Sequence, residues 1–146
     1  MRLRRFAGRI RSEERGAALV EFALVVPLLM AMMCVIIDFG LALHTLNNLT
    51  SALREGARYG AVLRDPEPAA NDTRIRDRVS AYMSNYGSNT LAPSAVTVVL
   101  ETVGTVKNVR VTVSNYTYTP VTPLAPLFGM GTLRFTRSAI YRYEFQ

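Results

Sequence analysis

The chain has 146 residues, which is enough for one modest domain but not for two. Its formal net charge is +6, of which the first fifteen residues, with six arginines and two glutamates, carry +4. The nearly balanced remainder argues against nucleic-acid binding, and the single cysteine, Cys34, excludes an intramolecular disulfide and a thiolate metal cluster.

An apolar run extends from Ala17 to Leu43 and contains two charged residues, Glu21 and Asp38. As an α-helix this run would be about 40 Å long, which exceeds the roughly 30 Å of a bilayer's hydrocarbon core. The uncharged stretch between the two acids would cover about 24 Å, so each acid can lie near an edge of the core, where a charge costs less than at its centre. We therefore predict a transmembrane helix over residues 17–43, with local loosening at Pro27.

The distribution of arginine predicts the orientation of this helix. All six N-terminal arginines precede the apolar run, so the positive-inside rule predicts a cytoplasmic leader over residues 1–16 and a head over residues 44–146 across the membrane. In a bacterium this is a single-pass inner-membrane protein with a periplasmic head. A cleaved secretory signal with Gly40 and Ala42 before the cut is the simpler alternative, but the apolar run is longer than such signals use and holds an acid near its start.

Glu21 has a physical explanation if the chain is cut after Gly16. Ala17 then becomes a new N-terminus, and the Glu21 carboxylate lies one helical turn from its ammonium group. Pairing with that group, or with that of a neighbouring subunit, offsets the cost of placing a carboxylate in lipid. The start of a helix also favours negative charge.

Three sequence segments carry a resemblance to a known family: "RGAALVEFALVVPLL" at 15–29, "DFG" at 38–40 and "REGARYGAV" at 54–62. Together they resemble the TadE-like family, the pseudopilins of the tight-adherence, or Flp type IVb, pilus system. Gly16, Glu21 and Phe22 match the short basic leader and the glutamate at mature position five of type IV prepilins. Major Flp pilins are very short, so this longer chain is expected to be a pseudopilin and not the main filament subunit.

The resemblance implies a site and a set of partners. Cleavage between Gly16 and Ala17 would be carried out by a prepilin peptidase, and Glu21 and Phe22 would serve assembly. The implied partners are other pilin-like subunits and the pilus secretion platform in the inner membrane, and the implied function is assembly of a pilus used in cell adhesion.

Beyond the membrane, residues 44–63 continue the helix with an amphipathic pattern. One apolar stripe contains Leu46, Leu49, Leu53 and Ala57. Glu55 and Arg58 are spaced to form an ion pair. The one-turn spacing of Gly56 and Gly60 predicts close packing, either within this chain's own fold or against another helix.

A loop is expected at 64–72, because Pro66 and Pro68 would stop the preceding helix from continuing. A second helix is expected at 73–86. Asn71 or Asp72 would cap this helix and Gly87 would end it.

From about residue 95 the apolar period changes to two, which predicts strands at about 95–103, 107–119 and 132–145. In the second strand the valines at 109, 111 and 113 share one face, whereas Tyr116 and Tyr118 fall on the other. Either a bulge shifts the register or the tyrosines cover a second surface. The third strand alternates cleanly, with Leu133, Phe135, Ala139, Tyr141, Tyr143 and Phe145 on one face.

The sequence contains no recognisable arrangement of catalytic residues. His44 is the sole histidine, and neither a phosphate-binding glycine loop nor a zinc-binding pattern is present. We predict no enzymatic activity, no cofactor and no metal. The expected fold is α+β: a long N-terminal transmembrane helix that continues into a small head with a second helix and a three-stranded antiparallel sheet.

A second hypothesis is a signal-anchored periplasmic binding module unrelated to pilus assembly. It is motivated by Tyr116 and Tyr118 and by the proline-rich, uncharged segment 120–131, whose apolar residues include Leu127, Phe128 and Met130.

Overall fold

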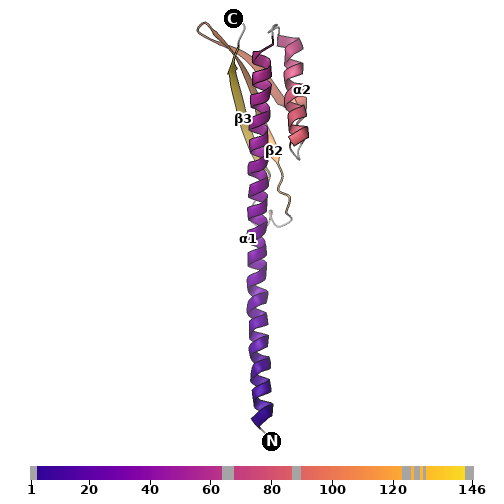
Figure 1. Ribbon diagram of the computed structural model, residues 1–146, viewed down its shortest axis with the longest axis vertical. Helices are drawn as coiled ribbons and strands as arrows, with labels where there is room; N and C mark the ends of the chain where they lie inside the picture. The colour runs from indigo at the N-terminus through magenta and orange to yellow at the C-terminus, as the bar shows by residue number, and fades with distance from the viewer. Residues whose placement is uncertain are drawn as a thin grey trace.

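The computed structural model describes residues 3–63, 68–86, 90–122, 126, 129 and 131–143. The elements follow in the order α1 (Leu3–Ala61), α2 (Pro68–Tyr86), the short 3-10 helix η1 (Pro93–Ala95), β1 (Val96–Val103), β2 (Val106–Tyr118) and β3 (Leu133–Arg142). Figure 1 shows a long helical stem with the second helix and the sheet gathered around one end of it. The expected α+β architecture is confirmed.

The stem is a single helix of 59 residues. At about 1.5 Å per residue it is roughly 88 Å long. The helix passes through Gly16 at the end of the basic leader and through Pro27 in the apolar run without a break. The loosening expected at Pro27 therefore does not divide α1.

The second helix begins at Pro68, earlier than residue 73, where the sequence pattern placed its start. Proline is accepted in the first turn of a helix, because the N–H that it lacks has no intrahelical partner there. Asn71 and Asp72 therefore lie inside α2 and do not cap it, and Asp72 forms an ion pair with Arg76, four residues further on. The expected stop at Gly87 lies outside the described residues.

The three strands form one antiparallel sheet in the order β1-β2-β3. Pairing between β2 and β3 shifts between Val113 and Tyr116, and Asn115 has a positive φ of 57°. Asparagine is one of the few non-glycine residues that tolerate this conformation. The irregularity turns Tyr116 and Tyr118 to the buried face, so the bulge is the correct one of the two interpretations.

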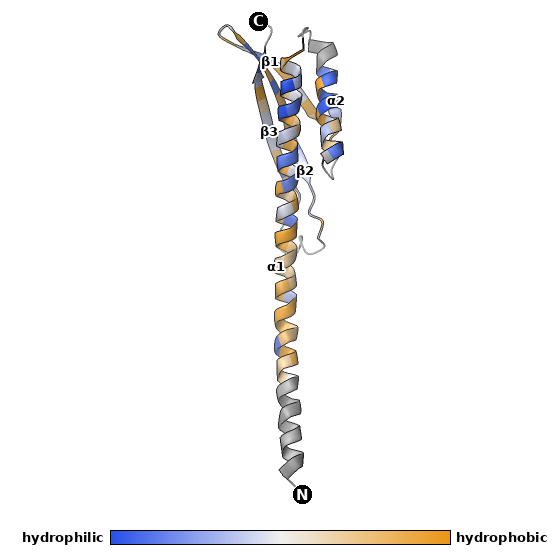
Figure 2. Cartoon of the chain, in the orientation of Figure 1, coloured by the Kyte–Doolittle hydropathy of each residue, from blue (hydrophilic) through white to orange (hydrophobic). Residues whose placement is uncertain are grey.

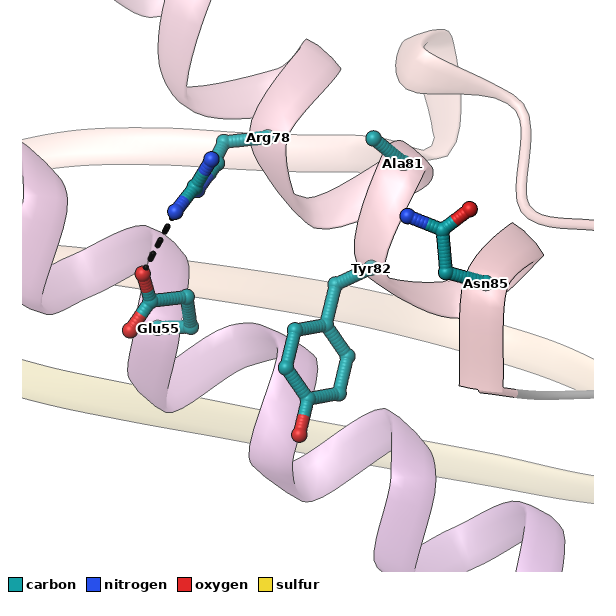
Figure 3. A pocket seen from close by; sticks show the side chains of 5 residues that line it. All are labelled: Glu55, Arg78, Ala81, Tyr82 and Asn85. Carbon is teal, nitrogen blue, oxygen red and sulfur yellow. Dashed lines mark hydrogen bonds and ion pairs between the residues drawn. The ribbon is translucent and has the colours of Figure 1, made fainter.

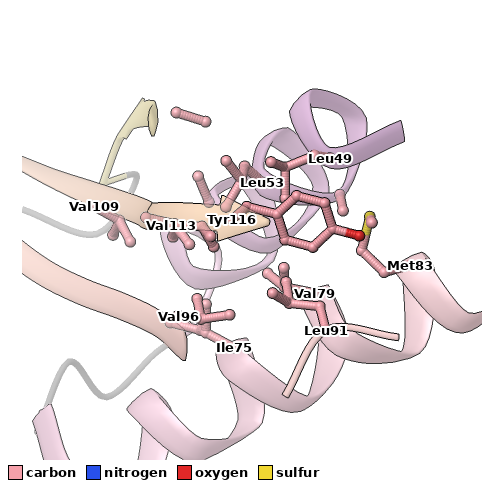
Figure 4. Close-up of a cluster of buried hydrophobic side chains, with 14 of the residues drawn as sticks. Leu49, Leu53, Ile75, Val79, Met83, Leu91, Val96, Val109, Val113 and Tyr116 are labelled. Carbon is pink, nitrogen blue, oxygen red and sulfur yellow. The ribbon is translucent and has the colours of Figure 1, made fainter. Parts of the chain in front are cut away.

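The hydrophobic core lies between the sheet and the two helices (Figure 4). The upper part of α1 contributes one stripe to it, α2 another, and the valines of β1 and β2 cover them from the sheet. The fully buried members of largest volume are Leu49, Leu53, Met83, Val79, Val96, Val109, Val111 and Val113.

Gly56 and Gly60 explain why α2 lies so close to α1. A Cβ atom on Gly56 would lie 2.3 Å from Cγ2 of Val79, and one on Gly60 would lie 2.7 Å from Cδ1 of Ile75. Both distances are shorter than van der Waals contact allows. The two glycines therefore serve packing inside this chain's own fold.

The third strand ends at Arg142, and Tyr143 ties the sheet to the stem. The Tyr143 backbone N–H donates to the carbonyl oxygen of Lys107 at 2.8 Å, and its hydroxyl donates to the carbonyl oxygen of Leu63 at 2.6 Å. The predicted continuation of the strand to residue 145 lies outside the described residues. Of the predicted inward face, Ala139 and Tyr143 are buried and Phe135 is partly buried against the core, whereas Leu133 and Tyr141 are exposed.

Candidate functional site

Above its grey N-terminal turns, the part of α1 below the head is coloured mostly as hydrophobic in Figure 2, and most of its side chains are exposed. Among the described residues, one helical stretch, Gly16–Ala61, is long and apolar enough to cross a membrane, and no residue of its most apolar window is buried. The exposed side chains in its lower part include Leu19, Phe22, Leu24, Leu28, Leu29, Met32, Met33, Ile36 and Ile37. An apolar surface of this extent is unfavourable in water and suits a lipid environment. One N-terminal helix of this chain can therefore span a membrane once.

The predicted cleavage and assembly residues lie at the base of this stretch. Gly16, Ala17, Glu21 and Phe22 are all exposed and lie within the continuous helix. Nothing lies within 4 Å of the position where a Cβ on Gly16 would be. A small side chain at position 16 would therefore meet open space among the described residues.

Helical geometry places Glu21 one turn above Ala17, as the spacing requires. In this uncut chain the Ala17 nitrogen is a backbone amide and carries no charge. The ion pair between Glu21 and a new N-terminus stays a prediction that concerns the processed chain.

The second acid of the apolar run, Asp38, is buried at 3 % exposure, although its neighbours Ile37 and Phe39 on α1 are exposed. Its Oδ1 accepts hydrogen bonds from the backbone N–H of Val121 at 2.9 Å and of Thr122 at 3.1 Å. The Thr122 hydroxyl donates to the other carboxylate oxygen. A segment that leaves the end of β2 is thus attached to the stem at Asp38.

This attachment was not foreseen from the sequence. The pattern placed Asp38 near a membrane edge but gave it no partner, because Val121 and Thr122 lie more than eighty residues further along the chain. Tyr118 adds a long contact of 3.5 Å from its hydroxyl to the Asp38 carbonyl oxygen. Burial, together with the negative charge of Asp38, raises the pKa of Tyr118 above its ordinary value.

In the head, α1 and α2 are linked by a group of charges around Glu55 (Figure 3). Arg58 contacts Glu55 at 3.0 Å, as its spacing predicted, and Arg78 of α2 contacts it at 3.1 Å, which the sequence did not reveal. The Arg78 guanidinium also lies 5.9 Å from the centre of the Tyr59 ring. These contacts hold the polar edges of the two helices together above the core.

The two arginines beside Glu55 lower the pKa of its carboxyl. Partial burial raises the pKa of the Glu55 carboxyl, but hydrogen bonds and charge attraction from Arg78 and Arg58 outweigh it and hold the pKa below its ordinary value. A shallow pocket beside this group is lined by Glu55, Arg78, Ala81, Tyr82 and Asn85. The carboxylate is already paired with two guanidinium groups, so the arrangement suits a structural link better than proton transfer.

Metal binding has no support in the part of the chain that the structure describes. No group of three or more histidine, cysteine, aspartate or glutamate side chains comes together there. His44 instead lies on the exposed side of α1, with its Nε2 3.0 Å from the side-chain nitrogen of Asn48.

The part of the chain that matches a known protein family lies in α1. Residues 16–58 match the family described as TadE-like protein. The matched segment begins at the glycine before the apolar run and ends in the part of α1 that packs in the head. No curated protein and no solved structure gives a match to the chain. From Gly16 to Arg58, which covers the exposed apolar stretch of α1 and most of its buried continuation, the chain is similar to the TadE-like family.

Proposed function

We propose that the chain is a membrane-anchored pseudopilin, processed after Gly16, that takes part in the assembly of a Flp-type, or tight-adherence, pilus. The observation that carries this proposal is the base of the exposed apolar helix. There Gly16 and Glu21 lie on one continuous, accessible helix, within the segment that matches the TadE-like family. A helix of this kind, fused directly to a folded head, suits a subunit that is held in the membrane and passed into an assembly.

In this proposal the basic leader stays in the cytoplasm and the head lies in the periplasm. A prepilin peptidase removes residues 1–16, and the new ammonium group at Ala17 becomes available to the Glu21 carboxylate of the same or a neighbouring subunit. The exposed apolar side chains of the stem then pack against other pilin-like helices or the secretion platform. Assembly, and not catalysis, is the proposed activity.

The direct test is the mass of the mature N-terminus. Full-length protein, produced in cells that contain the prepilin peptidase, is extracted from membranes and analysed by mass spectrometry. We expect a chain that begins at Ala17, and we expect Gly16→Leu to retain the leader. Gly40→Ala, at another open helical glycine, is the matched control and should be cleaved normally. Normal piliation with the leader still attached would overturn the proposal.

A second test concerns Glu21. We expect Glu21→Ala to insert in the membrane and lose its leader but to abolish pilus production, because the ammonium group then has no carboxylate partner. Asp77→Asn, which removes an exposed carboxylate from α2 in the head, is the control and should leave pilus production unchanged. Pili in normal number on cells that carry Glu21→Ala would remove the assembly role of this acid.

The alternative of a ligand-binding head loses part of its basis. Tyr116 and Tyr118, which motivated it, are only 7 % and 3 % exposed and belong to the interior of the head. They do not offer a stacking surface to a ligand. The apolar residues Leu127, Phe128 and Met130, which also motivated it, lie outside the described residues.

A further inference from the structure

The depth of Asp38 relative to the membrane can be judged from the side chains around it. Going from Asp38 toward the head, the outer faces of α1 still expose Phe39, Leu41 and Leu43. The first exposed polar side chains beyond them are His44 and Asn47. Since the apolar surface ends at Leu43 and not at Asp38, the edge of the lipid lies about one helical turn or more on the head side of Asp38.

The head therefore reaches down to a level that the lipid also reaches. Figure 1 shows the chain leaving β2 and descending beside α1 past the lower end of α2. The hydrogen bonds from Val121 and Thr122 to Asp38 fix that segment at the depth of the carboxylate. The carboxylate itself is shielded, because backbone and hydroxyl donors of the head surround it.

The side chains at this end of the head suit a lipid environment. Val121 is 70 % exposed although it is apolar, and Leu133, which pairs with Tyr118 at the same end of the sheet, is 40 % exposed. No charged residue occurs from Val111 to Leu133, and Arg134 then follows as an exposed basic residue. Apolar tips with a basic residue at the rim are typical of protein surfaces that lie in the boundary between headgroups and acyl chains.

We propose that the head makes a second contact with the membrane, in which Val121 and Leu133 enter the headgroup–acyl boundary of the leaflet next to the head. Arg134 lies at the rim of this contact and faces the lipid headgroups. The occupant of the surface is lipid, because the surface continues the lipid-exposed band of α1 at the same depth. The inference depends on α1 spanning a membrane and is independent of any role in pilus assembly.

The proposal is tested on the full chain in lipid nanodiscs, in a Cys34→Ala background. Val121→Cys is labelled with an environment-sensitive fluorophore, and Val103→Cys is the matched control. Val103 is a valine of similar exposure, 65 %, but it lies at the β1–β2 turn, at the opposite end of the sheet. Quenching is measured with nitroxide-labelled lipids and with aqueous iodide.

We expect lipid nitroxides to quench the label at 121 several-fold more than the label at 103, and iodide to show the reverse order. A second pair guards against a local disturbance at Val121: Leu133→Cys should behave like position 121, and Ile140→Cys, further along the same strand, should behave like 103. Equal access of iodide to both members of each pair would overturn the proposal. Protection of 121 and 133 from both quenchers would also overturn it, because protein and not lipid would then cover them.

Discussion

The two halves of α1 have the same backbone and opposite surroundings. From Gly16 to Ile37 the helix exposes most of its leucine, methionine and phenylalanine side chains, whereas above Asp38 the side chains of Leu49, Ala52, Leu53 and Ala57 are completely buried. No break or linker separates the halves. One helix can therefore serve two environments when its sequence changes from uniform apolarity to a single apolar stripe.

The two halves should respond differently to the same substitution. In the exposed lower half a leucine side chain packs against nothing in the head and contributes little to the folding of the head. In the upper half it fills a closed core, where its removal leaves a cavity.

Leu53→Ala should destabilise the head by about 2–5 kcal/mol, because Leu53 is completely buried between α1, α2 and the sheet. Leu28→Ala removes the same atoms from the exposed lower half and should leave the unfolding of the head nearly unchanged. Urea unfolding of the full chain in micelles, followed by tyrosine near-ultraviolet circular dichroism, measures both. Equal losses in the two variants would contradict the division of α1 into a lipid-facing and a core-forming half.

Gly56→Ala should destabilise the head by about 1–3 kcal/mol, because the new methyl group would collide with Val79 and separate the two helices. Gly40→Ala adds the same methyl group where nothing lies within 4 Å and should cost nothing. The same unfolding measurement applies. A neutral Gly56→Ala would mean that α2 moves freely away from α1.

Asp38→Ala tests the junction between the halves. The N–H groups of Val121 and Thr122 would lose their acceptor, and we expect a local loss of about 1–2 kcal/mol because neither residue is completely buried. Amide hydrogen exchange at these two residues should accelerate by roughly tenfold. Asp38→Asn keeps an oxygen that can accept and should retain most of the protection. Unchanged exchange in Asp38→Ala would show that the segment is held without the carboxylate.

The smallest expected effect is a dependence of the head's free energy of unfolding on pH. The pKa of Glu55 in the folded chain is below its ordinary value, so its ion pairs stabilise the head above the unfolded pKa, and this contribution is lost as the pH falls through the folded pKa. Arg58 and Arg78 are more than half exposed, which keeps the effect below about 1 kcal/mol.

Unfolding free energies of the wild type and Glu55→Gln, measured from pH 7 to pH 3, should converge at the acidic end. Asp77→Asn, at an exposed acid of α2, is the control for the general effect of removing a negative charge. A constant difference between the wild type and Glu55→Gln across this range would contradict the assignment.

Local patterns were sufficient to predict most of the fold. Apolar periodicity gave the stem, the second helix and the three strands, and i, i+3 spacing gave the pair of Glu55 and Arg58. The glycine spacing at 56 and 60 correctly indicated close packing. Each of these features depends on residues within one or two turns of each other, so a single sequence contains the necessary information.

The features that could not be predicted from the sequence are of two kinds. Some depend on contacts between distant residues, and others on local patterns that are compatible with two different structures. The partners of Asp38 and the contact of Arg78 with Glu55 join segments far apart in the chain, and no local pattern encodes them. Pro68 was interpreted as a breaker, although proline fits the first turn of a helix equally well. Period-two alternation could not decide whether an extra residue, here near Asn115, shifts the register of β2.

The unbroken course of α1 has a mechanical consequence. A helix that runs from Leu3 to Ala61 without a hinge behaves as a stiff rod, and its upper end is clamped between α2 and the sheet. A force applied along the membrane normal at one end is therefore delivered to the other with little loss in bending. Lifting the subunit out of the bilayer would raise the head by the same distance as the base, and twisting the base would turn the head through the same angle.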